Sequence, residues 1–162
     1  MLRRLVLALV AMVAALAQSG AVAQRERQPP YWASISSGRA LMRTGPAQSY
    51  PGVWLYVRSG LPVRVVATQP NWRRVQDPDG ATGWMMVRLL SDARTALVTG
   101  GEPRPMHSEP DPSSPVRYLA EPGVVGGLSR CSEGWCRLDV GGRAGFIRAG
   151  HVWGLDPNEE VD

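Results

Sequence analysis

The side chains that could do chemistry in this chain are two cysteines and two histidines. Cys131 and Cys136 lie in the segment CSEGWC with four residues between them, and His107 and His151 lie in predicted turns. In an oxidising compartment an even number of cysteines indicates a disulfide, and a strand–turn–strand junction brings opposed side chains together. The alternative is a redox or metal pair, which Cys-x-x-Cys spacing would favour more strongly. We therefore expect a local disulfide, no metal site and no cofactor.

A further possibility is a Cys/His peptidase, in which a cysteine thiolate would act with His107 or His151. A disulfide removes that thiolate. The chain also contains no Gly-x-Ser-x-Gly, no His-Glu-x-x-His and no Gly-rich loop placed between a strand and a helix. We expect a protein that is not an enzyme.

The chain is organised around a stretch that occurs twice, at residues 60–84 and 123–146. In each copy a glycine lies twelve residues before a tryptophan, Trp72 or Trp135. The tryptophan opens a Trp-x-x-apolar frame, which is followed by a Gly-rich turn and then by glycine and an aromatic residue. The second copy is one residue shorter in that turn, where hairpins absorb deletions. We interpret the stretch as an internal repeat.

Side chains alternate along a strand, so each repeated frame has two faces. Val75 and Leu138 fall on the apolar faces, which we expect to be core. Trp72 and Trp135 fall on the polar faces. Such a ring is either covered by a neighbouring loop or by the other copy, or it belongs to a shallow aromatic groove for a peptide or glycan. The groove candidates, mainly in the first copy, are Tyr50, Trp54, Trp72, Arg74, Trp84 and Trp135.

Basic residues accompany these aromatic residues in the first copy. The arginines that could attract a carboxylate or phosphate, or could equally form a solvated surface, are Arg58, Arg64, Arg73 and Arg74. All 18 basic residues of the chain are arginine. Without Arg3 and Arg4, 16 arginines oppose 14 acids, a formal charge of about +2. That charge is too weak to indicate a nucleic-acid partner.

The N-terminus predicts export. Arg3 and Arg4 precede a thirteen-residue apolar run at 5–17, and Ala21-Val22-Ala23 presents the small residues that a signal peptidase reads. The alternative is an uncleaved anchor, but the run is short for a membrane-spanning helix. We expect cleavage after Ala23, no later membrane span, and a mature protein in the periplasm or the medium.

The remaining chain has an all-β pattern. Proline and glycine make up 32 of the 162 residues, and no helical periodicity follows Ala23. The first half contains ALMRTGPAQSYP, GLPVRVVA, NWRRV, Asp-Gly and GWMMVRLL, and the second contains EPGVVGGL, GWCRLDVGGRAGF and HVWGL. Together these segments, over residues 31–155, resemble two copies of the bacterial SH3-like (SH3b) domain, the second more diverged. The resemblance implies two tandem, small, partly open SH3-like β-barrels.

This pattern predicts six segments. They are a signal peptide at 1–23, a leader at 24–30, a first SH3-like domain at 31–98, a linker at 99–104, a second domain at 105–155 and a solvated acidic tail at 156–162. The resemblance implies a non-enzymatic binding or adaptor protein of the bacterial cell envelope, whose partner is an envelope protein, a peptide or peptidoglycan. The alternative is a structural scaffold with its aromatic residues buried between the barrels.

Overall fold

A computed structural model describes residues 27–162 as two seven-stranded antiparallel sheets. The predicted signal peptide and residues 24–26 of the predicted leader lie outside the described residues. The first sheet contains β1 (Tyr31–Ile35), β2 (Ala40–Arg43), β3 (Gly52–Tyr56), β4 (Pro62–Gln69), β5 (Trp72–Gln76), β6 (Thr82–Met86) and β7 (Leu90–Ser91), with the 3-10 turn η1 (Val87–Leu89) before β7. The second contains β8 (Thr95–Val98), β9 (Arg104–His107), β10 (Val116–Ala120), β11 (Val125–Ser132), β12 (Trp135–Val140), β13 (Arg143–Arg148) and β14 (Val152–Trp153), with η2 (Ala149–His151) before β14.

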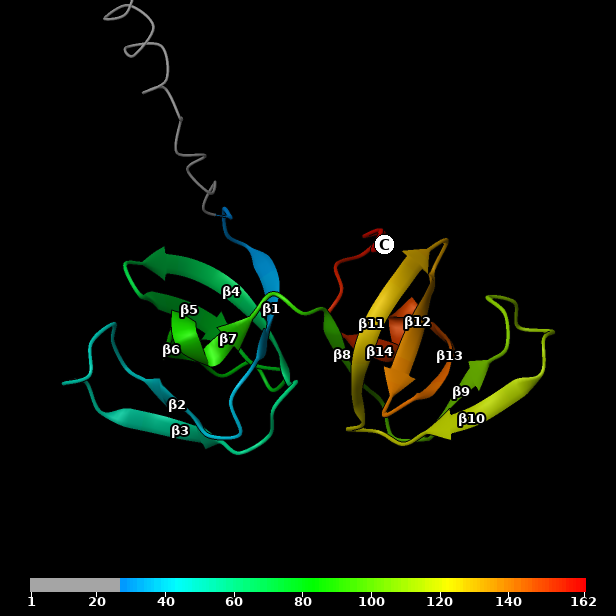
Figure 1. Cartoon of the computed structure of the whole chain (residues 1–162), viewed down its shortest axis with the longest axis horizontal. Helices are drawn as coiled ribbons and strands as arrows, with labels where there is room; N and C mark the ends of the chain where they lie inside the picture. The colour runs from blue at the N-terminus through cyan, green and yellow to red at the C-terminus, as the bar shows by residue number, and fades with distance from the viewer. Residues whose placement is uncertain (1–26) are drawn as a thin grey trace, which may run out of the picture.

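The second sheet repeats the topology of the first. The strand orders are β3-β2-β6-β5-β4-β1-β7 and β10-β9-β13-β12-β11-β8-β14, so each strand has a counterpart seven strands later. Figure 1 shows the two sheets curled into barrels that lie side by side. The predicted fold, two tandem SH3-like barrels, is confirmed. We call β1–β7 the first barrel and β8–β14 the second barrel. No helix in the described part of the chain is long and apolar enough to cross a membrane.

The repeated glycines hold equivalent turns. Gly60 and Gly123 have φ angles of +80° and +82°, a region that residues with a Cβ rarely adopt. The amide of Gly60 donates to the carbonyl of Ile35 at 2.7 Å, and the amide of Gly123 donates to that of Val98 at 2.8 Å. The spacing that defined the repeat therefore reflects one turn, used twice.

The predicted domain boundary is wrong. Strand β8, expected to end the first domain, pairs instead with β11 and β14 of the second sheet. Its residues Ala96 and Val98 are buried in the second core. The chain crosses between barrels at 92–94, and residues 99–104, predicted as a linker, connect strands within the second barrel or begin β9. The physical reason is that β8 is the counterpart of β1, so each barrel needs it to cover one side of the core.

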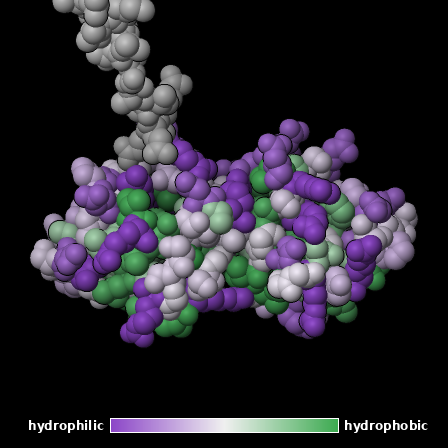
Figure 2. All heavy atoms as spheres, viewed as in Figure 1, coloured by the Kyte–Doolittle hydropathy of each residue, from purple (hydrophilic) through white to green (hydrophobic). Residues whose placement is uncertain are grey.

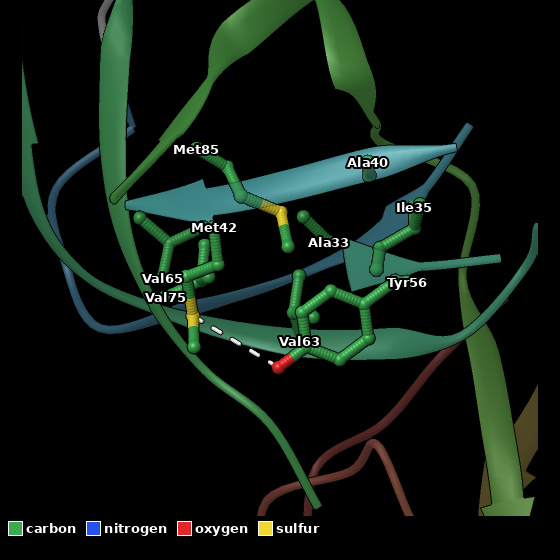
Figure 3. Packing of buried hydrophobic residues seen from close by; sticks show 9 residues of the cluster. All are labelled: Ala33, Ile35, Ala40, Met42, Tyr56, Val63, Val65, Val75 and Met85. Carbon is green, nitrogen blue, oxygen red and sulfur yellow. Dashed lines mark hydrogen bonds between the residues drawn. The ribbon is translucent and has the colours of Figure 1, made fainter. Parts of the chain in front are cut away.

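Each barrel encloses its own core. The first contains Val75 and Met42, and the second contains Leu138 and Met106, as the alternation predicts. Figure 3 shows the side chains of the first core converging from β1 to β6, with the Tyr56 hydroxyl directed at the Met42 sulfur. The face drawn in Figure 2 is largely hydrophilic, with hydrophobic atoms exposed in separate places over both barrels. Two small cores, rather than one shared core, hold the fold.

The barrels meet through side chains of β1, β4 and β14 and of adjoining loops. The Trp32 and Trp153 rings contact edge to face at 4.6 Å between centroids, and the Arg64 guanidinium lies 5.6 Å from the Trp32 centroid. Arg64 also pairs with Asp156 at 3.0 Å. Arg58 donates to the carbonyl of Gly123 at 2.7 Å. We call these contacts the seam.

The acidic tail, predicted to be solvated, folds back instead. The backbones of Val161 and Cys131 exchange hydrogen bonds of 2.8 and 3.1 Å. Glu159 pairs with Arg94, whose Nη2 lies 3.1 Å from Oε2. The prediction failed because acids in a short segment stay solvated only when no basic partner lies within reach, and the partly buried Arg94 supplies one.

Candidate functional site

Trp72 and Trp135 lie opposite the cores, as predicted, but are not exposed. Neither belongs to the core clusters around Val75 and Leu138. Their exposed fractions are only 7% and 5%. Each ring is therefore covered by neighbouring parts of the protein, which does not exclude a groove beside it.

A groove of about 380 Å³ lies beside Trp72. Its walls come from three places: the β2–β3 loop, the tip of the β4–β5 hairpin, and η1 with the end of β6. The lining residues are Pro46, Ala47, Gln48, Asn71, Trp72, Met86, Val87 and Arg88. Trp72 and Met86 are cross-strand partners, so they form an apolar floor between walls that include the polar side chains of Gln48, Asn71 and Arg88.

The same face of the sheet continues from this floor to Trp84. Arg74 and Trp84 are cross-strand partners, and Arg43 of β2 is the partner of Trp84 on its other side. Directly paired residues project from one face, so these three side chains form a row next to the Trp72–Met86 pair. Register thus brings together three predicted candidates, Trp72, Arg74 and Trp84. It adds Arg43 and Met86, which were not among the predicted candidates.

The arginines that the sequence predicted as possible ligand contacts make different interactions in the structure. Arg58 and Arg64 belong to the seam, and Arg73 donates to the Tyr31 hydroxyl at 3.0 Å. Arg74 is exposed and makes a long hydrogen bond, 3.5 Å, to the Thr82 hydroxyl. Arg88, which the sequence did not single out, is exposed at the wall of the groove. Arg74 and Arg88 are therefore the arginines of this face that a ligand could reach.

Tyr50 and Trp54 lie apart from the groove lining. The Tyr50 ring packs on Gly45, where an added Cβ would come within 2.6 Å of it. The Tyr50 carbonyl accepts a hydrogen bond from Arg43 at 2.7 Å, which ties the β2–β3 loop to the sheet. Trp54 is 60% exposed on the edge strand β3, where it is the cross-strand partner of Met42. Tyr50 therefore shapes the loop that walls the groove, while Trp54 belongs to another surface.

The second barrel closes the equivalent place. Trp135 is the cross-strand partner of Arg148, whose guanidinium lies 4.1 Å from the ring centroid. His107 contacts the same ring edge to face at 5.4 Å, and its Nδ1 lies 2.9 Å from the Ser114 carbonyl oxygen. Arg148 stands where the first barrel has Met86, and Gly150 stands where it has Arg88. The ring of Trp135 is thus covered by charged and polar side chains of its own barrel.

The predicted disulfide is present. Cys131 and Cys136 are joined, with an S–S distance of 2.11 Å, at the end of the β11–β12 hairpin. Both are buried beside a larger cavity of about 670 Å³, which is walled partly by the tail.

The other group that the sequence offered for catalysis, His151, lies in η2. Burial, and then the nearby Arg104 and Arg148, lower the pKa of His151. Within residues 27–162, no three His, Cys, Asp or Glu side chains gather so as to hold a metal ion.

Known proteins share little sequence with this chain. A search of curated proteins finds no match. Among solved structures, NlpC2 from Trichomonas vaginalis is 12% identical, with a TM-score of 0.36 over 82% of this chain and 52% of that one. An NlpC/P60 family protein from Bacillus cereus ATCC 10987 is 14% identical, with a TM-score of 0.34 over 75% of this chain and 55% of that one. The chain thus spans about half the length of these structures.

The family comparison covers most of the chain. The model of the bacterial SH3 domain matches twice, at residues 36–92 and 100–154. The matches fall on the two barrels and include the groove, the Trp84 row and the disulfide hairpin. The chain belongs to the bacterial SH3 domain family and carries two tandem copies of the domain.

Proposed function

We propose that this protein is a non-enzymatic binding module of the bacterial cell envelope, which holds a peptide or peptidoglycan-type ligand in the Trp72 groove of the first barrel. Bacterial SH3 domains commonly bind cell-wall material, and both copies in this chain are of that family. The signal-peptide pattern at 1–23 and the disulfide between Cys131 and Cys136 support export to the periplasm or medium.

The groove at Trp72 is the observation that carries the proposal. Its floor is the paired Trp72 and Met86, and its walls include the polar side chains of Gln48, Asn71 and Arg88. An apolar floor with polar groups at the rim suits an extended chain, because the floor buries side chains or sugar faces while the rim fixes the backbone. The groove is open in the first barrel, whereas Arg148 covers the equivalent ring in the second.

Filling the groove tests the proposal. Gln48 is exposed at the rim, and Pro112 is exposed at the equivalent position of the β9–β10 loop. We expect Gln48→Trp to reduce co-sedimentation of the full chain with purified peptidoglycan sacculi at least about tenfold, since the new ring occupies the space of the ligand. Pro112→Trp, which adds the same ring to the second barrel, should leave sedimentation unchanged. Equal loss in both variants would contradict a site in the first barrel.

The scaffold alternative rests on a different observation, the aromatic contact at the seam. The rings that meet there are Trp32 and Trp153, and neither is a groove candidate. A scaffold predicts that wild-type protein binds neither sacculi nor any protein of an envelope extract. The scaffold alternative would be excluded if wild-type protein bound sacculi and Gln48→Trp abolished that binding.

A further inference from the structure

The two barrels carry opposite charge. Residues 27–91, which contain the first barrel, have eight arginines and two acids, a formal charge of +6. Residues 95–162 have six arginines and ten acids, a formal charge of −4. A cleft lined by one sign of charge raises the local concentration of ligands of the other sign. The groove lies in the basic barrel.

Neither acid of the first barrel offsets the charge beside the groove. Asp77 is 4% exposed, and its carboxylate accepts hydrogen bonds from the Tyr56 hydroxyl and from the amides of Asp79 and Ala81. Asp79 lies in the β5–β6 turn, while Trp72 is at the opposite end of β5. At 3.3 Å per residue, that strand separates the turn from Trp72 by about 13 Å. The groove face therefore presents positive charge alone.

The positive groups alternate with apolar surface along this face. Arg88 is at the groove wall, the Trp72–Met86 pair forms the floor, and Arg74 lies beside Trp84 on the next cross-strand pair. A guanidinium binds a carboxylate through two parallel hydrogen bonds, and a flat ring packs against aliphatic groups. Along the strands, the cation Arg88 is thus followed by the apolar floor and then by Trp84 and Arg74, which lie side by side.

We infer that the ligand of the first barrel is an extended peptide that bears carboxylates, which Arg74 and Arg88 bind while its apolar groups lie on Trp72 and Trp84. This inference rests on the proposed function and names the ligand class for the same groove. A phosphate polymer fits less well, because it favours a continuous basic track along its backbone, and here the arginines are separated by apolar surface.

The second barrel serves as an internal comparison. Arg137 is the counterpart of Arg74, but it pairs with Asp139 at 3.8 Å, where the first barrel has Gln76. Gly150 replaces Arg88, so that positive group is missing. The exposed positive charge that could receive a carboxylate is therefore present at these positions of the first barrel and absent or paired in the second.

Calorimetric titration of the full chain tests the inference with a defined probe. The probe is a synthetic hexapeptide of alternating glutamate and alanine, and its twin carries glutamine in place of glutamate. We expect the acidic peptide to bind about tenfold more tightly than its twin at low salt, and the difference to shrink as salt rises. Arg74→Gln and Arg88→Gln should each weaken binding of the acidic peptide about two- to fivefold. Arg137→Gln should not weaken it.

The outcomes separate this inference from the proposed function. Equal binding of the two peptides, or equal weakening by Arg137→Gln and Arg74→Gln, would overturn the carboxylate assignment. If Gln48→Trp still abolished sedimentation with sacculi, the proposed function would stand without the carboxylate assignment. Tighter binding of inorganic polyphosphate, with the same loss in Arg74→Gln and Arg88→Gln, would assign the groove to a phosphate polymer and also overturn the inference. If the wild-type chain bound neither sacculi, nor either peptide, nor any protein of an envelope extract, the proposed function itself would be removed.

Discussion

The buried carboxylate of Asp77 holds the β5–β6 turn of the first barrel against its core. One oxygen accepts the amides of Asp79 and Ala81, at 3.1 and 2.7 Å, and the other accepts the Tyr56 hydroxyl at 2.7 Å. Burial, and then the hydrogen bond to Asp77, raise the pKa of Tyr56 far above its ordinary value. The Tyr56 hydroxyl therefore stays protonated and donates to the Asp77 carboxylate, whose other hydrogen bonds come from the amides of Asp79 and Ala81.

Tyr56→Phe should lower the free energy of unfolding by about 2 kcal/mol, because a buried charged acceptor loses one donor. Chemical denaturation followed by fluorescence measures the change. The control is the same substitution at Tyr118, which is 39% exposed on β10 and should change stability by less than about 0.5 kcal/mol. Equal effects at the two positions would show that the hydroxyl of Tyr56 contributes nothing specific.

Local alternation was sufficient to predict which face each residue of the repeat takes. It placed Val75 and Leu138 inside and Trp72 opposite them, and all three lie so. It did not decide whether Trp72 would be buried, because the β2–β3 loop that lines the groove with it lies more than twenty residues earlier in the chain. Nor could it separate Trp84, a neighbour of the groove, from Trp54 on the edge strand, since that depends on strand order.

At the scale of elements, strand existence was easier to predict than strand membership. The all-β pattern predicted from the sequence is confirmed, with seven strands in each barrel of the described chain. Thr95–Val98 fell within the predicted first domain but belongs to the second barrel, because a four-residue apolar segment carries no signal of its partner. The tail shows the same limit: its contact with Cys131 is made by backbone groups, which leave no trace in composition.

The docking of the tail should depend on pH through Glu159. Partial burial alone would raise the pKa of this carboxyl, but the hydrogen bonds from Arg94 and from the Asp156 amide outweigh burial and hold its pKa below the ordinary value. A lowered folded-state pKa contributes stability that is complete above about pH 5 and is lost as pH falls through that lowered pKa. Hydrogen-exchange protection of the Val161 and Cys131 amides, which pair across this contact, reports the loss.

Glu159→Gln should reproduce the acid effect at neutral pH. We expect it to reduce the protection of both amides about fivefold, equivalent to about 1 kcal/mol, since the charged partner of Arg94 is gone. Glu160→Gln removes the adjacent, exposed charge and should leave protection unchanged. If both variants exchanged like the wild type, the backbone bridge alone would hold the tail.

At the scale of the whole molecule, the seam joins a basic barrel to an acidic one. Arg64 of the first barrel contacts Trp32 of its own barrel and Asp156 beyond β14, while Trp32 contacts Trp153 of the second barrel. The ion pair is about one-third exposed on each side and contributes little by itself. The aromatic contact buries more apolar surface, so it should dominate the coupling between barrels.

Trp153→Ala should therefore uncouple the unfolding of the two barrels. The wild-type chain is expected to show one calorimetric transition, with equal calorimetric and van't Hoff enthalpies, because each barrel is stabilised by the other across the seam. Loss of the ring should cost about 2 kcal/mol and separate the endotherm into two. Trp54→Ala, which removes a ring that is 60% exposed on β3, should preserve the single transition. Two transitions already present in the wild type, at temperatures that Trp153→Ala does not change, would mean that the barrels are stable independently and that the seam only orients them.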